Sequence, residues 1–267
     1  MEYKDLVNRG RNFEEHKYLY KDHGCYLLKK DKKISESEKI KELVSNDEYF
    51  AAYVKQIIDD GTGLYEEDLA AKKNKSNTGK EIDGIKQYRG EEETRKKADE
   101  MGPGERKCEA RIFEKYEKKE HNDLGYARYY QSPITREKGR EGASEKIDII
   151  FNKSNNIFIC ELKDIDSNET LLSPITEILT YYFCIMKKEE NSNKYFIRSF
   201  TEEWGNYNAN DTYNIIPTII IPEKMMCSNY YLKKFLSQLK KYNINLECYY
   251  LEYSDPKVEI NKLLLAK

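Results

Sequence analysis

Two apolar runs at residues 146–151 and 157–163 form the strongest pattern in the chain, and each carries charged side chains among isoleucine, phenylalanine and cysteine. Runs of this length, separated by the turn-rich residues 152–156, predict two β-strands joined as a hairpin. A buried carboxylate or ammonium group costs several kcal/mol unless it is paired or bound to a metal ion. The aspartate, glutamate and lysine inside these predicted strands therefore call for a chemical reason.

The elements around the hairpin follow from the same kind of pattern. Apolar residues recur at helical spacing over 105–121, and a strand-like run follows at 126–131. Ser173 and Pro174 are typical of an N-cap and a first helical residue, and they precede a largely apolar helix over 175–186. The remaining predicted elements are strands at 195–200, 214–221 and 246–253 and an amphipathic helix at 230–242. This order predicts an α/β protein of the α+β type, with a mixed sheet flanked by helices.

The first hundred residues are charged and weakly periodic, and two stretches, 35–44 and 47–59, are predicted to be helices. The sequence Asp59-Asp60-Gly61-Thr62-Gly63 predicts the end of the second helix. A strong break follows at Met101-Gly102-Pro103-Gly104. We therefore expect two parts, a mainly helical N-terminal region at 1–103 and a second domain at 104–267.

The amino-acid composition limits which kinds of functional site the chain can build. The chain of 267 residues has 46 lysines and arginines against 48 acidic residues, so any nucleic-acid surface must be local. Six cysteines without a C-x-x-C pair are typical of a reducing cytoplasm. The chain has only three histidines, and they are scattered, which argues against a histidine-based zinc site or a Ser/His/Asp triad. Since no apolar leader and no run of about 18 apolar residues is present, we expect a cytoplasmic protein without a membrane span.

Strand alternation brings the charged side chains together. Glu161 and Lys163 project to one face of their strand, and Asp148 on the partner strand lies across from them. Two carboxylates and a nearby backbone carbonyl, here that of Leu162, are the oxygen ligands that Mg²⁺ prefers. The lysine would position or activate a water molecule and offset phosphate charge. The pattern therefore indicates metal-dependent phosphodiester hydrolysis, with Mn²⁺ as a substitute ion.

The residues Ile147-Asp148, followed after twelve intervening positions by Glu161-Leu162-Lys163, resemble the signature of the PD-(D/E)xK nuclease superfamily. Isoleucine stands where the family name has proline. The resemblance covers roughly residues 105–253 and implies a restriction-endonuclease-like core of helix, three strands, helix and strand. The E-x-K motif alone is weak, because the chain has five copies, of which only the one at Glu161 lies in an apolar strand. The alternative reading of that copy is a simple ion pair on an edge strand.

The same resemblance implies further site residues. Glu109, on the helix before the strands, is similar to an acidic residue that family members often carry there, and Glu114 is the competing choice. Glu177-x-x-x-Tyr181 resembles the Q-x-x-x-Y element of the RecB nuclease branch, with glutamate in place of glutamine. An i, i+4 pair shares one helix face, so both side chains would point toward the metal edge of the sheet. Otherwise Glu177 favours the helix N-terminus electrostatically and Tyr181 belongs to the core.

A basic loop lies between the first two predicted strands. Its side chains Arg136, Lys138 and Arg140 are candidates for phosphate contacts, although such charge runs are often only solvated.

The leading hypothesis is a Mg²⁺-dependent endonuclease acting on DNA, with RNA not excluded, in a restriction or phage-defence setting. A homodimer is the simplest way to cut both strands. The alternative is a catalytically inactive nuclease-fold module that binds nucleic acid or protein, and a small-molecule hydrolase ranks last because the chain has no phosphate-binding loop.

Overall fold

Six strands form one mixed sheet in the order β1-β2-β3-β4-β5-β6. The computed structural model describes residues 36–76, 98–134, 146–167, 171–191, 213–225 and 229–263. The strands are β1 (Tyr126–Pro133), β2 (Lys146–Lys153), β3 (Asn156–Leu162), β4 (Asn214–Pro222), β5 (Glu247–Ser254) and β6 (Lys257–Lys262). Strands β1, β2 and β3 form an antiparallel meander, β3, β4 and β5 pair in parallel, and β6 returns antiparallel to β5. The predicted mixed α/β fold with helices around the sheet is confirmed at this level.

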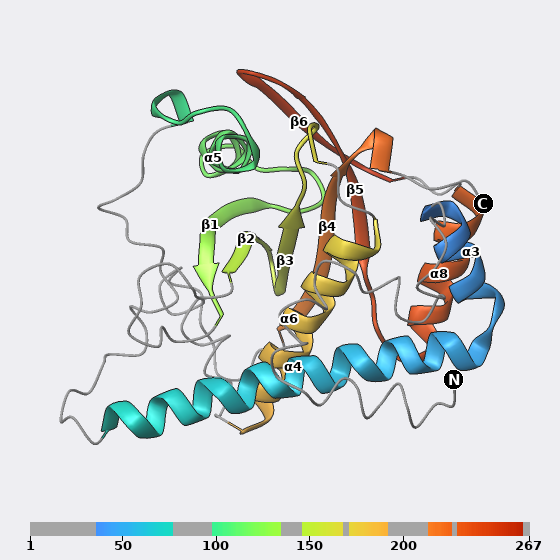
Figure 1. Cartoon of the computed structure of the whole chain (residues 1–267). Coiled ribbons are helices and arrows are strands. Elements are labelled where there is room, and N and C mark those ends of the chain that lie inside the picture. The colour runs from blue at the N-terminus through green and yellow to red at the C-terminus, as the bar shows by residue number, and fades with distance from the viewer. Residues whose placement is uncertain are drawn as a thin grey trace.

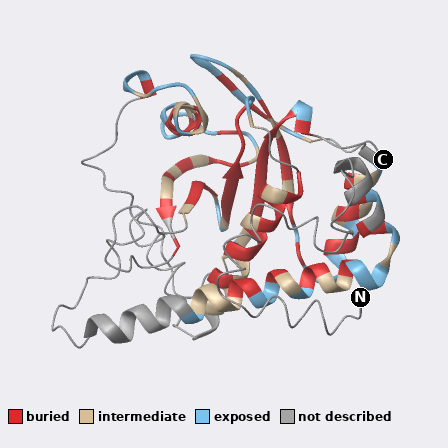
Figure 2. Ribbon diagram, viewed as in Figure 1, coloured by how far each residue is buried: buried red, intermediate tan, exposed pale blue. Residues whose placement is uncertain are grey.

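Helices cover both faces of the sheet (Figure 1). Along β3, Ile157 and Ile159 belong to the same core cluster as the apolar side chains of α6 (Leu172–Asn191). The intervening Phe158 and Cys160 belong to the cluster of α5 (Glu105–Tyr116). This division follows from the period of two in a strand and leaves the middle strands buried on both sides (Figure 2).

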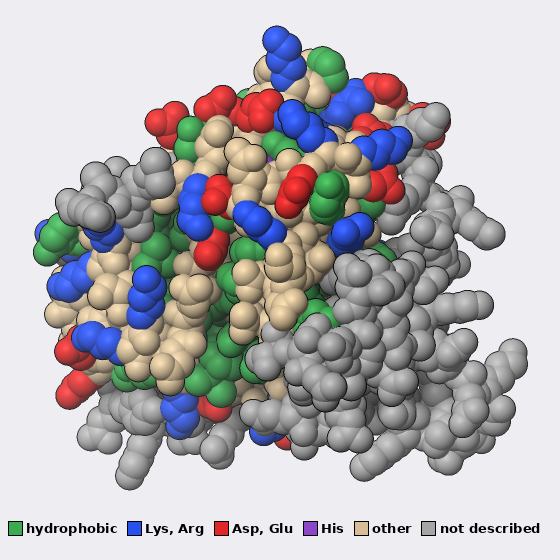
Figure 3. Space-filling model, turned by 180° about the vertical axis from the view of Figure 1, so that it is seen from behind, with side chains coloured by type: hydrophobic (Ala, Val, Ile, Leu, Met, Phe, Trp, Pro, Cys, Tyr) green, Lys and Arg blue, Asp and Glu red, His purple; other side chains and the backbone are tan. Residues whose placement is uncertain are grey.

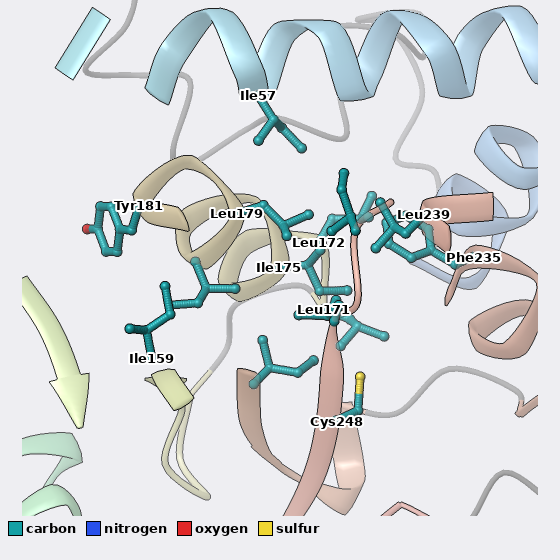
Figure 4. Packing of buried hydrophobic residues seen from close by; sticks show 14 of the residues in the cluster. Ile57, Ile159, Leu171, Leu172, Ile175, Leu179, Tyr181, Phe235, Leu239 and Cys248 are labelled. Carbon is teal, nitrogen blue, oxygen red and sulfur yellow. The ribbon is translucent and has the colours of Figure 1, made fainter. Parts of the chain in front are cut away.

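The N-terminal helices α3 (Glu36–Ser45) and α4 (Asp47–Ser76) share the core of α6 and of α8 (Asn229–Lys241). The Phe50 ring lies edge-on to Phe235 with centroids 5.2 Å apart, and the Tyr53 hydroxyl is 2.9 Å from Thr176 Oγ1. Figure 4 shows Ile57 of α4 facing the apolar side of α6. The described part of the N-terminal region thus completes the core over α6, while the expected division at residue 103 stays a prediction.

The prediction that the second N-terminal helix ends at residues 59–63 is wrong, because α4 continues through both glycines to Ser76. A Cβ atom built on Gly61 would lie 2.7 Å from Phe183 Cβ and 2.7 Å from the Thr180 carbonyl oxygen of α6. Gly61 is therefore a packing glycine that lets the two helix backbones approach each other. Local sequence favours a stop at glycine, and the tertiary contact overrides it.

Most other elements were correctly predicted, including the β2–β3 hairpin, β4, β5 and α8. Helix α5 ends at Tyr116, earlier than expected, and α6 begins at Leu172, before Ser173. The edge strand β6 was missed, although Val258 and Ile260 alternate with exposed charged neighbours as half-buried strands do. The predicted strand at 195–200 lies outside the described residues. Short 3₁₀ turns occupy Ala98–Glu100 and Glu223–Met225, and no described helix has the length and apolarity that a bilayer crossing requires.

Candidate metal centre

Charged side chains from four elements meet at one end of the β1–β2–β3 meander. The cluster lies where β3 ends and β2 begins, between the first turns of α5 on one face and those of α6 on the other. Its members are Glu105, Glu109, Gln131, Asp148, Glu161, Lys163 and Glu177. We call this set the acidic cluster. The sheet thus delivers residues that are far apart in sequence to one small volume.

The β2–β3 hairpin sets the position of Asp148. The register pairs Ile149 with Cys160, which places Asp148 across from Glu161 as the alternation predicted. The backbone N–H of Leu162 donates to Asp148 Oδ2 at 2.8 Å. The contact that Leu162 makes here is therefore through its amide, and its carbonyl as a metal ligand stays a prediction.

Lys163 follows β3 and is 4% exposed. Its Nζ lies 2.8 Å from Glu161 Oε1, 3.8 Å from Glu177 Oε2 and 3.9 Å from Glu105 Oε2. Burial alone would lower the pKa of Lys163, but the surrounding carboxylates outweigh burial and raise it above its ordinary value. The ammonium group therefore stays charged, and it acts as a hydrogen-bond donor.

Three carboxylates converge beside this lysine. One oxygen each of Glu105, Glu109 and Asp148 lies within 4.8 Å of the others. Glu105 was not among the residues predicted for the site, although it stands four residues before Glu109 and so shares its helix face. Glu114, the competing choice, faces another way, since its Oε1 accepts a bond of 2.9 Å from the Ala98 N–H. The structure thus brings Glu109, and not Glu114, to the cluster.

Burial changes the acidity of these groups. Desolvation raises the pKa of Glu109 to about 7, partly offset by the hydrogen bond from Gln131. Desolvation and the Glu109 carboxylate raise the pKa of Asp148 well above its usual range. Desolvation and the Asp148 carboxylate do the same for Glu161. The cluster thus crowds together more carboxyl groups than Lys163 can neutralise, so they hold protons more tightly, and a further cation would relieve the same repulsion.

The donor atoms fit a hard divalent cation such as Mg²⁺ or Mn²⁺. Such ions take carboxylate oxygens and water, and three carboxylates offer oxygens within bridging distance of one another. Glu161 adds an independent observation, because its buried Oε2 has no hydrogen-bond partner among the described residues. An unsatisfied buried carboxylate oxygen is costly, and an ion or an ion-bound water would satisfy it. Glu161 itself lies outside the three converging carboxylates and contacts Lys163 through Oε1.

Glu177 and Tyr181 lie on the face of α6 that meets the cluster. The Tyr181 hydroxyl donates to Glu177 Oε1 at 2.8 Å, and Glu177 Oε2 faces Lys163. Tyr181 is also buried in the core, and Figure 4 shows its hydroxyl turned away from the aliphatic side chains. The Tyr181 ring therefore packs in the core while its hydroxyl reaches the cluster through Glu177, and a functional role for the pair stays a prediction.

The basic loop with Arg136, Lys138 and Arg140 lies outside the described residues, so its predicted phosphate contacts stay a prediction. On the described surface seen from behind, acidic and basic side chains are interspersed (Figure 3). A nucleic-acid surface would have to be local, as the balanced composition indicates.

Comparison of the chain with models of protein families, with curated proteins and with solved structures gives no match.

Proposed function

We propose that this chain is a Mg²⁺-dependent nuclease that hydrolyses phosphodiester bonds of DNA, with an internal cut as the expected mode. The observation that carries the proposal is the acidic cluster, in which converging carboxylates and a buried lysine meet beside an unsatisfied Glu161 oxygen. Buried charge of this kind is expensive unless it is paired or coordinates a metal ion, and such groups cluster at sites of binding or chemistry. The element order α5-β1-β2-β3-α6-β4 supports a restriction-endonuclease-like core, because it is the order that the sequence resemblance implies.

In this proposal three carboxylates bind the cation and Lys163 acts on the water and the phosphate. Glu105, Glu109 and Asp148 would hold the cation, with the Leu162 N–H fixing the orientation of Asp148. The bound cation supplies charge neutralisation and Lewis acidity to phosphodiester hydrolysis. Lys163, kept charged by its carboxylate neighbours, would orient the attacking water and offset charge on the phosphate.

Glu161 and Glu177 aim the lysine. Glu161 Oε1 holds Lys163 Nζ at 2.8 Å, and Glu177, fixed by the Tyr181 hydroxyl, faces the same ammonium group at 3.8 Å. The Oε2 atom of Glu161 is left to accept from a water molecule in the site. A lysine held on two sides is pre-organised, so little rearrangement is needed when substrate enters.

The test is cleavage of supercoiled plasmid and linear duplex DNA in Mg²⁺ and in Mn²⁺, with RNA as a parallel substrate. Wild type should nick or cut DNA, and Lys163→Ala should lose this activity. Lys262→Ala is the matched control, because Lys262 also pairs with a glutamate, Glu247, but does so at the exposed edge strand β6. Equal cleavage by wild type and Lys163→Ala would reject the site. Metal and DNA binding without any cleavage would instead favour an inactive nuclease-fold module.

The proposal also covers how the protein selects its substrate and whether it forms a dimer. The N-terminal region is proposed to confer substrate choice or dimerisation, and a homodimer would place two such sites on the two strands of a duplex. A restriction or phage-defence role is the setting that the nuclease resemblance favours. Analytical ultracentrifugation with and without duplex DNA tests the assembly, and a monomer in both conditions would contradict the dimer.

A further inference from the structure

Gln131 is the neutral side chain inside the acidic cluster. The register of β1 with β2 pairs Tyr130 with Ile149 and Ser132 with Ile147, so Gln131 stands directly opposite Asp148. Its Nε2 donates to Glu109 Oε2 at 2.6 Å and to Asp148 Oδ1 at 3.3 Å. An amide nitrogen has two hydrogens, so one group ties the carboxylate of α5 to that of β2.

The backbone of Gln131 is strained. Its φ is +53°, a left-handed conformation that residues other than glycine rarely adopt. The other described non-glycine residues with positive φ, Ser154 and Asn243, lie in the turn of the β2–β3 hairpin and after α8, where this conformation is ordinary. Gln131 adopts it inside a strand. Such strain persists only where the surroundings impose it, and it clusters at functional sites.

We propose that Gln131 is a positioning residue that holds Glu109 and Asp148 together before the cation binds. This inference rests on the proposed function. Two buried carboxylates of like charge repel each other, and the Glu109 carboxylate raises the pKa of Asp148. A donor between them keeps their oxygens converged.

The chemical type of the side chain matters as much as its place. A lysine or arginine at this position would bring its own positive charge and compete with the metal ion for the two carboxylates. The neutral amide leaves the negative charge of the cluster available. Each carboxylate oxygen has a second lone pair, so an oxygen that accepts from Gln131 can still bind a cation. Glutamine thus positions the two carboxylates without adding a positive charge that would compete with the cation.

The test compares Gln131→Met with Gln238→Met by calorimetric titration with Mn²⁺ and Mg²⁺. Methionine keeps the length of the side chain and removes the donor. Gln238 is the matched control, because its Nε2 also donates to one carboxylate, Asp47 Oδ1, at 2.8 Å, but between α8 and α4. Gln131→Met should weaken metal binding by about 10- to 100-fold, the usual cost of losing a partner of a metal ligand. Gln238→Met should leave metal affinity unchanged.

Gln131→Gly separates the amide from the backbone. Glycine accepts the positive φ, so this variant should be thermally more stable than Gln131→Ala, yet it should lose metal affinity to the same extent as Gln131→Met. If wild type binds metal and both Gln131→Met and Gln131→Gly bind it equally well, the positioning role is rejected and the proposed function survives. If wild type itself binds no metal, the proposed function falls and this inference falls with it.

Discussion

Asp148 and Leu162 are joined across the β2–β3 hairpin, where the backbone N–H of Leu162 donates to Asp148 Oδ2 at 2.8 Å. This bond links the Asp148 carboxylate to the strand that carries Glu161. The chain continues from Leu162 to Lys163, whose backbone N–H donates to the Ile220 carbonyl of β4. The hairpin and its parallel neighbour thus fix the charged residues as parts of one sheet. Hydrogen bonds within the sheet thus set the framework of the site.

Replacing Asp148 by asparagine should remove metal binding while the protein remains folded. Asparagine keeps an oxygen that accepts from the Leu162 N–H, but it removes a negative charge from the three converging carboxylates. We expect a loss of Mn²⁺ affinity of at least about 100-fold, the upper end of the loss seen for partners of metal ligands. Calorimetric titration measures the affinity, and circular dichroism checks the fold. Unchanged affinity in the folded variant would contradict the assignment of Asp148.

Without metal, the stability of the protein should fall as pH rises. The pKa of Glu109 is raised from 4.5 to about 7, so the folded state binds its proton more tightly than the unfolded state. The resulting stabilisation is complete below pH 4.5 and is lost as pH rises through about 7. The shift corresponds to a loss of about 3 kcal/mol in the free energy of unfolding.

Urea denaturation in EDTA from pH 5 to pH 8 measures this loss. Glu109→Gln should flatten the decline and be more stable than wild type at pH 8. Glu114→Gln on the same helix is the control, because that carboxylate bonds the Ala98 N–H away from the cluster, and it should keep the wild-type slope. A wild-type slope in Glu109→Gln would show that Glu109 does not titrate in this window.

Two glycines of α4 should respond in opposite directions to alanine. Gly61→Ala places a methyl group 2.7 Å from the Thr180 carbonyl oxygen and from Phe183 Cβ, so it should destabilise the protein by about 1–3 kcal/mol. A Cβ on Gly63 meets nothing within 4 Å, and Gly63→Ala should stabilise by about 0.5–1 kcal/mol through helix propensity. Thermal and urea unfolding measure both changes. Equal effects of the two substitutions would contradict the close packing of α4 on α6.

Tyr181→Phe should separate a role in the site from a role in the core. Tyr181→Phe removes the 2.8 Å bond from its hydroxyl to Glu177 within α6, and Tyr53→Phe removes the 2.9 Å bond between α4 and Thr176 of α6. Both variants should lose about 0.5–1.5 kcal/mol of stability. Only Tyr181→Phe should also slow DNA cleavage, because only that bond fixes the carboxylate that faces Lys163. Equal cleavage by the two variants would assign Tyr181 to the core alone.

The sequence predicted the parts of the fold and site that depend on local periodicity. Alternation along 157–163 assigned the faces of β3 and brought Asp148 opposite Glu161, as the register shows. The apolar setting singled out Glu161 among five E-x-K copies, and its burial follows from that setting.

The features that depend on tertiary contacts were not predictable in the same way. Gln131 belongs to no motif, and its contact with Glu109 spans 22 positions and joins a strand to a helix. Gly61 has the local sequence of a helix stop, and only the approach of α6 explains why the helix continues. Glu105 could have been found, since i, i+4 spacing places it beside Glu109, but its own E-x-K motif lies in a helix and carried no strand signal.

Binding of a metal ion by the acidic cluster is tested most directly by a crystal structure of the protein soaked in Mn²⁺, with anomalous diffraction used to locate the ion. We predict an anomalous peak within about 2.2 Å of oxygens of Glu105, Glu109 and Asp148. Loss of this peak in Asp148→Asn would confirm the assignment. At saturating Mn²⁺, a wild-type cluster without an anomalous peak, or with a peak only at surface carboxylates elsewhere, would contradict it.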